Sequence, residues 1–164
     1  MPRDGRDPND LNIRMKTQPY AILCSGDDGV VVEGFDYFAT TFRLDDCDGS
    51  EIRNSTLLYP STSKRSLGYA GEDMDNRHVS RVDDCIGCLV DRCDFLYTDG
   101  AAFEAHGGAS SSQNNTINNS YFYHIDWSGS DQKSLMTTIM MDGTTNRFTN
   151  NTMHKTGTSA TIRI

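Results

Sequence analysis

A short motif that recurs five times at the same phase is the feature that most constrains the fold of this chain. Each copy has an apolar residue, a small or polar residue two positions later (usually Asn), and a large apolar residue five positions after the first. The copies begin at Val32, Ile52, Val90, Ile117 and Phe148, and so start 20, 38, 27 and 31 residues apart. A fixed local pattern with variable spacing is typical of a repeat architecture in which no unit buries its apolar face alone. We therefore expect about five coils of a solenoid, joined by loops of variable length.

The composition favours an all-β protein. Hydrophobic residues make up 36% of the 164 residues, and Val, Ile, Phe and Tyr fall in the short alternating runs that strands need. No window shows a sustained helical period. The formal net charge of −8 argues against a nucleic-acid partner, because a phosphate backbone demands clustered Lys and Arg. No apolar run is long enough for a membrane span, so we also expect no membrane span.

A second segment extends the repeat. Residues 41–49 share Arg, Asp-Asp-Cys and Gly at one phase with residues 79–87, and both segments precede a copy of the first motif by the same offset. Equivalent strands are predicted at 103–106, 139–142 and 162–164. Alternation along these strands sends the apolar residues inward. The residues expected inside are Phe42, Leu44, Val82, Phe103, Ala105, Ile139, Met141, Ile162 and Ile164.

The outward positions are expected to line up in columns, because neighbouring strands of stacked parallel coils lie roughly 4.8 Å apart. The first column contains Arg43, Arg81, Glu104, Met140 and Arg163. The second contains Asp45, Asp83, His106 and Asp142. The third follows the large apolar residue of the motif by two positions and contains Tyr59, Tyr97, His124 and Lys155.

Rungs of the form Ile-x-Asn-x-x-Leu/Phe, with stretches such as Val31–Phe35 and Asn118–Phe122, resemble the right-handed parallel β-helix superfamily, also called pectin-lyase-like. The resemblance covers the chain from about Tyr20 to its end. It implies an all-β, right-handed, single-stranded parallel β-helix of about five coils. That superfamily consists largely of secreted lyases, hydrolases and epimerases that act on acidic or neutral polysaccharides. Adhesion and phage-tail proteins share the fold, so function has to be argued from the site.

The two ends of the sequence suggest a fragment truncated at both ends. No signal peptide is recognisable at the start, and the chain finishes within an apparent strand at residues 160–164. We expect residues 1–19 to form an incomplete N-terminal coil. Residues 20–164 are expected to form the β-helix domain, with a long loop insertion at 60–77 and missing C-terminal coils. From the resemblance we expect an extracellular or periplasmic protein, monomeric as part of a longer chain.

Cysteine and asparagine residues are predicted to be structural. Three readings are open for the five cysteines: an inward-facing ladder, a disulfide between the stacked Cys47 and Cys85, or a zinc site around Cys85, Cys88 and Cys93. The Asn residues of the motif share one turn column and are predicted to point inward as a ladder that satisfies its own amides. They are Asn54, Asn119 and Asn150.

The densest polar constellation lies in the later coils. The predicted catalytic residues are Glu104, His106, His124 and Asp142, which neighbouring coils would bring to one outward groove. The predicted substrate-binding residues are Arg81, Tyr97, Asp126, Trp127, Lys155 and Arg163. The expected ligand is a polysaccharide or oligosaccharide lying beside loops at 60–77, 107–113 and 128–134.

Such a groove suits two chemistries. In a lyase, a base such as His106 or His124 removes the proton beside a uronate carboxylate, and an Arg or a Ca²⁺ ion neutralises that carboxylate. In a glycoside hydrolase, Glu104 and Asp142 would be the pair of carboxylates. No cofactor is required by the sequence.

Non-catalytic alternatives stay open at this stage. Arg81 stacks below Glu104, so these residues could form a surface salt bridge without any catalytic role. A carbohydrate-binding or adhesive β-helix module without turnover is the alternative function, and a purely structural stalk is a third reading.

Overall fold

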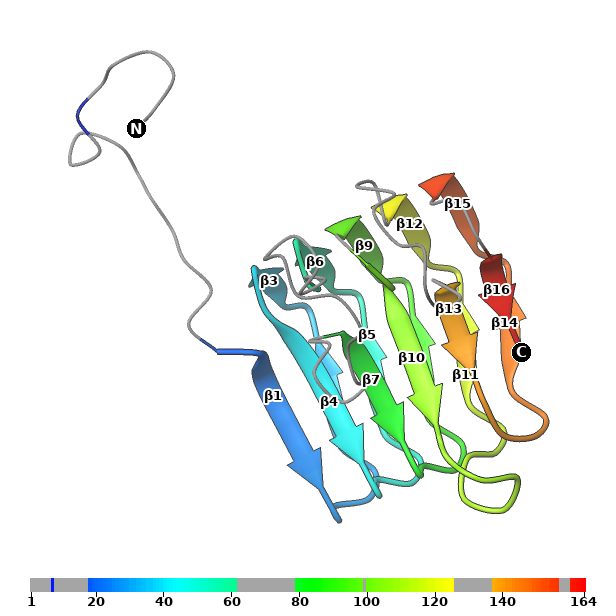
Figure 1. Cartoon of the computed structure of the whole chain (residues 1–164). Helices are drawn as coiled ribbons and strands as arrows, with labels where there is room; N and C mark the ends of the chain where they lie inside the picture. Colours follow the sequence, from blue (N-terminus) through cyan, green and yellow to red (C-terminus); the bar gives the residue numbers. More distant parts are fainter. Residues whose placement is uncertain (1–6, 8–17, 62–78, 99, 126–136, 157–159) are drawn as a thin grey trace.

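The computed structural model describes residues 7, 18–61, 79–98, 100–125, 137–156 and 160–164. These residues form a right-handed parallel β-helix whose coils stack along one axis (Figure 1). Each full coil contributes one strand to each of three parallel sheets, which we call A, B and C in the order that the chain visits them. The predicted fold class is therefore confirmed.

The three sheets contain six, five and five strands. Sheet A consists of β1 (Tyr20–Ser25), β4 (Thr41–Asp45), β7 (Ser80–Asp83), β10 (Phe103–His106), β13 (Thr137–Met141) and β16 (Ala160–Arg163). Sheet B consists of β2 (Val31–Glu33), β5 (Glu51–Arg53), β8 (Leu89–Asp91), β11 (Thr116–Asn118) and β14 (Arg147–Thr149). Sheet C consists of β3 (Asp36–Phe38), β6 (Thr56–Leu58), β9 (Asp94–Thr98), β12 (Tyr121–Ile125) and β15 (Thr152–Thr156).

The core is the bore of the solenoid, filled by the inward residue of each alternating strand. The apolar residues of the recurring motif stack there, with Ile52 above Val32 in sheet B and Phe122 above Phe95 in sheet C. The residues predicted to face inward from sheet A are buried from Phe42 through Met141. Ile162 and Ile164 are exposed instead, because no described coil covers that end of the stack.

All five cysteines are buried and free. Cys47 lies between two of the others: its Sγ is 3.1 Å from Sγ of Cys24, and its backbone N–H donates to Sγ of Cys85 at 3.2 Å. The thiols of Cys24, Cys47, Cys85 and Cys88 therefore lie in the bore where sheet A leads into sheet B, and Cys93 lies at the corner between sheets B and C. Of the three readings, the inward ladder is the one that the structure has.

The predicted inward Asn ladder is wrong in its residues. Asn54, Asn119 and Asn150 are exposed and have left-handed backbone conformations, with φ of 51°, 50° and 55°, at the two-residue corner between sheets B and C. Asn tolerates this conformation better than most residues, which explains why it recurs there. The buried Asn ladder lies one corner earlier, where Asn146 Oδ1 accepts from the N–H of Asn115 and Asn115 Oδ1 accepts from the N–H of Cys88.

Variation in coil length is concentrated between sheets C and A. That connection spans residues 39–40 in the first coil, 59–79 in the second and 126–136 in the fourth. The connection from sheet B to sheet C is two residues in every coil: 34–35, 54–55, 92–93, 119–120 and 150–151. Residues 1–6 and 8–17 of the predicted N-terminal coil, and 62–77 of the predicted insertion, lie outside the described residues.

Candidate functional site

The outer face of sheet A carries the first two predicted columns in register. Arg81 pairs with Arg43 on one side and with Glu104 on the other, and Glu104 pairs in turn with Met140. Asp83 likewise lies between Asp45 and His106. The parallel pairing thus joins residues that are dozens of positions apart in sequence.

Glu104 and His106 are two residues apart on β10, so their side chains lie on the same outer face. His106 Nε2 is 2.9 Å from Glu104 Oε2, and His106 Nδ1 is 3.7 Å from Asp142 Oδ2. The Glu104 side chain is only 2% exposed, whereas those of His106 and Asp142 are 20% and 33% exposed. The imidazole therefore lies between a buried carboxylate and an accessible one.

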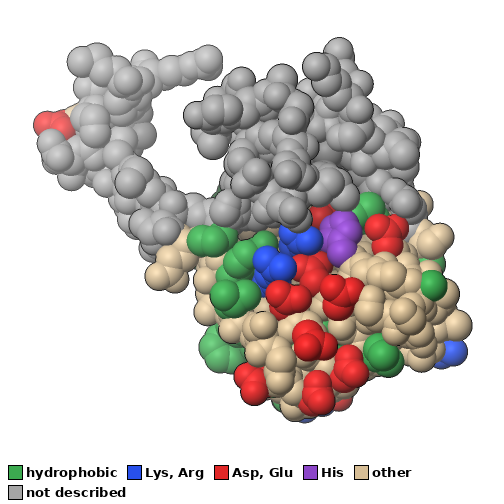
Figure 2. Space-filling model, turned by 60° about the horizontal axis from the view of Figure 1, so that its bottom comes forward, with side chains coloured by type: hydrophobic (Ala, Val, Ile, Leu, Met, Phe, Trp, Pro, Cys, Tyr) green, Lys and Arg blue, Asp and Glu red, His purple; other side chains and the backbone are tan. Residues whose placement is uncertain are grey.

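Two arginines and two further carboxylates continue this group toward the first coil. Asp83 Oδ2 is 3.0 Å from Arg43 Nε and 3.2 Å from Arg81 Nε. Arg43 Nη2 also contacts Asp45 Oδ2 at 3.2 Å. Strand pairing places Arg81 next to Glu104 and Asp83 next to His106, and so joins the two sets of ion pairs. We call the whole group the sheet A cluster: Arg43, Arg81, Asp83, Glu104, His106 and Asp142. Figure 2 shows basic, acidic and histidine side chains gathered on this face.

Burial and charge act in opposite directions on Asp83. Burial raises the pKa of its carboxyl above the ordinary value, while the nearby Arg81 and Arg43 guanidinium groups and His106 lower it. The net direction is upward, so desolvation outweighs the two ion pairs. The two ion pairs hold Arg43 and Arg81 at Asp83, and Arg81 is the arginine that pairs in register with Glu104.

A tight corner after β13 positions Asp142. The N–H of Asp142 donates to the carbonyl of Ala105 at 3.0 Å, and the hydroxyl of Ser112 donates to the carbonyl of Asp142 at 2.9 Å. Gly143 has φ of +117°, and a Cβ atom there would lie 1.9 Å from the carbonyl oxygen of Ser112. Only glycine fits this approach, which holds the Asp142 carboxylate beside His106.

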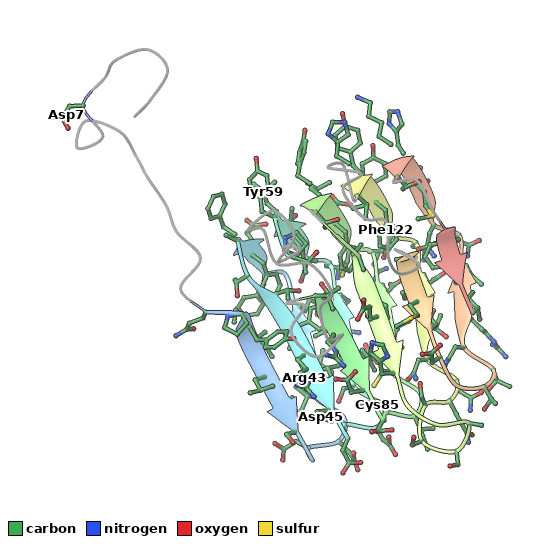
Figure 3. All side chains as sticks on the ribbon, viewed as in Figure 1. Asp7, Arg43, Asp45, Tyr59, Cys85 and Phe122 are labelled. Carbon is green, nitrogen blue, oxygen red and sulfur yellow. The ribbon has the colours of Figure 1, made fainter. Side chains whose placement is uncertain are left out.

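The residues of the third predicted column do line up, but they lie away from the sheet A cluster. Tyr59, Tyr97, His124 and Lys155 are at the corner between sheets C and A, where each strand of sheet A begins, whereas His106 ends β10. In each coil a strand of sheet A lies between this corner and the positions of the first two columns. Figure 3 shows Tyr59 at one edge of the molecule, with Arg43 and Asp45 farther along β4. The structure thus brings Glu104, His106, Asp142 and Arg81 together, and leaves Tyr97, His124 and Lys155 apart from them.

Three predicted residues have little or no description. Asp126 and Trp127 lie outside the described residues, and Arg163 is placed only by the pairing of its backbone with Met140. The sequence prediction also missed two members of the sheet A cluster. Arg43 and Asp83 belong to the predicted columns, and the register alone would have added them to the site.

No known protein-family model matches this chain, and it matches neither a curated protein nor a solved structure. Within the described residues, no group of three or more His, Cys, Asp or Glu side chains is arranged to hold a metal ion. The described part of the chain also has no helix with the length and apolarity of a membrane span.

Proposed function

We propose that this protein cleaves a polysaccharide by elimination, with His106 as the general base. The observation that carries the proposal is the 2.9 Å contact between His106 Nε2 and the buried Glu104 carboxylate. A carboxylate at this position favours the tautomer with hydrogen on Nε2, which leaves the lone pair on Nδ1 as the base. Orientation of a histidine by a buried carboxylate is a recurring arrangement in proton-transfer sites.

The remaining members of the sheet A cluster have roles in this mechanism. Nδ1 of His106 removes the proton next to the carboxylate of a uronate residue, and the carbanion expels the glycosidic oxygen two bonds away as a double bond forms. The leaving oxygen takes a proton from water, and the imidazolium returns its proton to solvent. Asp142, 3.7 Å from Nδ1, stabilises the imidazolium that results. Arg43, whose side chain is 33% exposed, is the described guanidinium that can neutralise the uronate carboxylate.

The fold supports a polysaccharide substrate by resemblance. A parallel β-helix with Ile-x-Asn rungs resembles the pectin-lyase-like superfamily, whose enzymes act largely on extracellular polysaccharides. Fold alone does not assign a reaction. We therefore propose a polysaccharide substrate and an extracellular or periplasmic location.

A glycoside hydrolase is the second candidate, because the cluster has an excess of carboxylates. The three carboxylates of the cluster, Asp83, Glu104 and Asp142, outnumber its two arginines, and Asp45 beside Arg43 adds a fourth. This balance favours a neutral glycan over an anionic one. Glu104 and Asp142 would then be the acid and base pair. Their disadvantage is that the His106 ring occupies the space between them.

One experiment separates these reactions. The chain is incubated with polyuronates and with neutral glycans, and both the ultraviolet absorbance of unsaturated product ends and the release of reducing ends are followed. Elimination produces both signals, hydrolysis produces reducing ends alone, and the absence of both on every substrate would refute an enzyme.

Variants test the assigned roles. His106→Ala should lower kcat by about 10²–10⁴-fold, the usual contribution of a general base. Glu104→Gln should lower kcat less, because an amide oxygen can still accept from Nε2–H. Arg147→Ala, on the exposed outer face of β14 in sheet B, is the matched control and should leave turnover unchanged.

A further inference from the structure

A row of aromatic and cationic side chains follows the corner between sheets C and A through four successive coils. Tyr59, Tyr97, His124 and Lys155 occupy equivalent corner positions, and Tyr123 and His154 precede the last two on the outer face of sheet C. We call these six residues the sheet C stripe. They lie where the strands of sheet C end, whereas His106 lies at the far end of β10 in sheet A.

The rings of the stripe contact one another without interruption. The ring centroids of Tyr59 and Tyr97 are 5.8 Å apart, those of Tyr97 and Tyr123 are 5.3 Å apart, and those of Tyr123 and His154 are 5.4 Å apart. Tyr59 is 45% exposed, and the other rings of the stripe are half-buried or exposed. The result is a continuous aromatic surface parallel to the axis of the solenoid.

The backbone conformation shows that these side chains are unusual for their positions. Tyr59, Tyr97, His124 and Lys155 all have φ between 53° and 58°. At the other two corners, the left-handed positions hold Gly, Asn or Asp in all cases but Arg92 and Thr145. The same conformation is strained for a bulky residue such as Tyr. Strain that recurs in consecutive coils points to a use for the side chains themselves.

The charge of the stripe changes along its length. Lys155, His124 and His154 lie in the last two coils, and Lys155 Nζ is 3.3 Å from the hydroxyl of Tyr123 and 5.4 Å from its ring centroid. A cationic end is notable in a chain whose formal net charge is −8. The tyrosines supply an apolar ring face and a hydroxyl at its rim, a combination that suits ligands with apolar faces and polar edges.

We infer that the sheet C stripe binds a glycan chain along the solenoid axis, with an anionic sugar residue at the Lys155 end. A pyranose ring has an apolar face that stacks on tyrosine and hydroxyl groups that reach the phenol oxygens. The coil repeat of roughly 4.8 Å is close to the length of one pyranose residue, so successive sugars can meet successive rings. The inference rests on the proposed function for its ligand class, and adds a polymer-binding site separate from the sheet A cluster.

The test measures binding and stability together, on the full chain. Affinity electrophoresis with polygalacturonate and with a soluble neutral β-glucan gives binding, and thermal unfolding gives stability. The double variant Tyr59→Asn/Tyr97→Asn should lower affinity for both polymers by about tenfold or more, because it removes two stacking rings. Its melting temperature should be unchanged or higher, because Asn accepts the left-handed conformation more readily than Tyr.

Two further variants sharpen the result. Lys155→Asn should weaken binding of polygalacturonate severalfold and leave the neutral glucan unaffected. Asn54→Tyr places a tyrosine at a left-handed position of the opposite corner, and should lower the melting temperature without changing either affinity. Unchanged affinity in the double variant, or a lower melting temperature as its only effect, would show that the tyrosines have a packing role and overturn the inference.

His106→Ala distinguishes this inference from the proposed function. That variant should lose cleavage and keep wild-type binding. If the wild-type protein cleaves the polymer and the stripe variants bind it as tightly as wild type, the stripe alone is refuted. If binding depends on the stripe and no cleavage occurs, the proposed enzyme alone is refuted. If neither polymer binds the wild-type protein, the glycan stripe is refuted.

Discussion

The rings of Phe95 and Phe122 are stacked in the bore of the solenoid with their centroids 4.8 Å apart and their planes 6° from parallel. The two residues are 27 positions apart in sequence, and the sheet C register places one directly above the other. Phe148 packs against Phe122 at 5.7 Å. Stacking of equivalent residues in consecutive coils is thus what holds the core together, and it makes the core sensitive to the loss of a single ring.

Phe122→Ala should lower the free energy of unfolding by about 3–5 kcal/mol, because it leaves a cavity between Phe95 and Phe148. Chemical denaturation followed by circular dichroism measures the change. Thr116→Ala, on the outer face of β11, is the control and should change stability by less than about 1 kcal/mol. Equal effects of the two substitutions would contradict a stacked core.

Gly143→Ala should destabilise the protein far more than Gly87→Ala. A Cβ at Gly143 meets the backbone of Ser112, whereas a Cβ at Gly87 has no heavy atom within 4 Å and suffers only from a φ of +74°. We expect a loss of about 3 kcal/mol or more for Gly143→Ala and about 1 kcal/mol for Gly87→Ala. The melting temperatures of the two variants, measured side by side, test the close approach between residue 143 and the Ser112 carbonyl. Equal melting temperatures would contradict it.

Tyr37→Phe should stabilise the protein by about 1 kcal/mol at neutral pH, because it removes a buried hydroxyl that has no hydrogen-bond partner among the described residues. Burial raises the pKa of Tyr37 from 10.0 to about 12. For an acid whose folded pKa is raised, the contribution to stability is fully present below the unfolded value and is lost as the pH rises through the folded value.

Wild-type stability should therefore fall between pH 10 and about pH 12, and the Tyr37→Phe variant should fall less over that window. Denaturation at a series of alkaline pH values measures the difference. Tyr121→Phe, which changes a half-buried tyrosine on the outer face of sheet C, is the matched control. Parallel pH profiles for wild type and Tyr37→Phe would show that the Tyr37 hydroxyl is hydrated or bonded.

The cysteine thiols should resist alkylation in the native protein. Burial raises the pKa of the Cys24 and Cys93 thiols to about 11, so both thiols are protonated at neutral pH. Burial also keeps the alkylating reagent from reaching them. Iodoacetamide labelling followed by mass spectrometry should be at least about tenfold slower in the folded state than in denaturant. Rapid native labelling of all five cysteines would mean that the bore opens readily.

The sequence was enough to predict the coils and the register of the sheet A columns, because inward apolar residues repeat at a fixed phase. It did not place the third column correctly relative to the first two. Tyr97 and His106 are close in sequence, but Tyr97 lies near the end of β9 in sheet C and His106 lies at the end of β10 in sheet A, so β10 separates them. The prediction that the Asn54 side chain points inward was also wrong. An Asn in a repeat suits either a buried amide ladder or an exposed left-handed corner, and the sequence does not distinguish the two.

The ion pairs within the sheet A cluster could not be predicted from the sequence, for a different reason. The columns predicted that Asp83 lies next to His106, but the actual ion pairs depend on side-chain rotamers. Asp83 contacts Arg43 and Arg81, and His106 turns to Glu104 on its own strand. Register predicts neighbours, whereas the choice of partner among neighbours is decided by geometry and burial.

The corner between sheets C and A differs from the others in one more respect, which concerns how such a protein can change. Connections there range from residues 39–40 to residues 59–79 without altering the register of the strands on either side. The corner between sheets B and C keeps two residues in every coil. Insertions at the corner between sheets C and A therefore leave the register of the strands unchanged. Evolution, or a designer, can exchange whole segments beside the sheet C stripe while the solenoid beneath them stays the same.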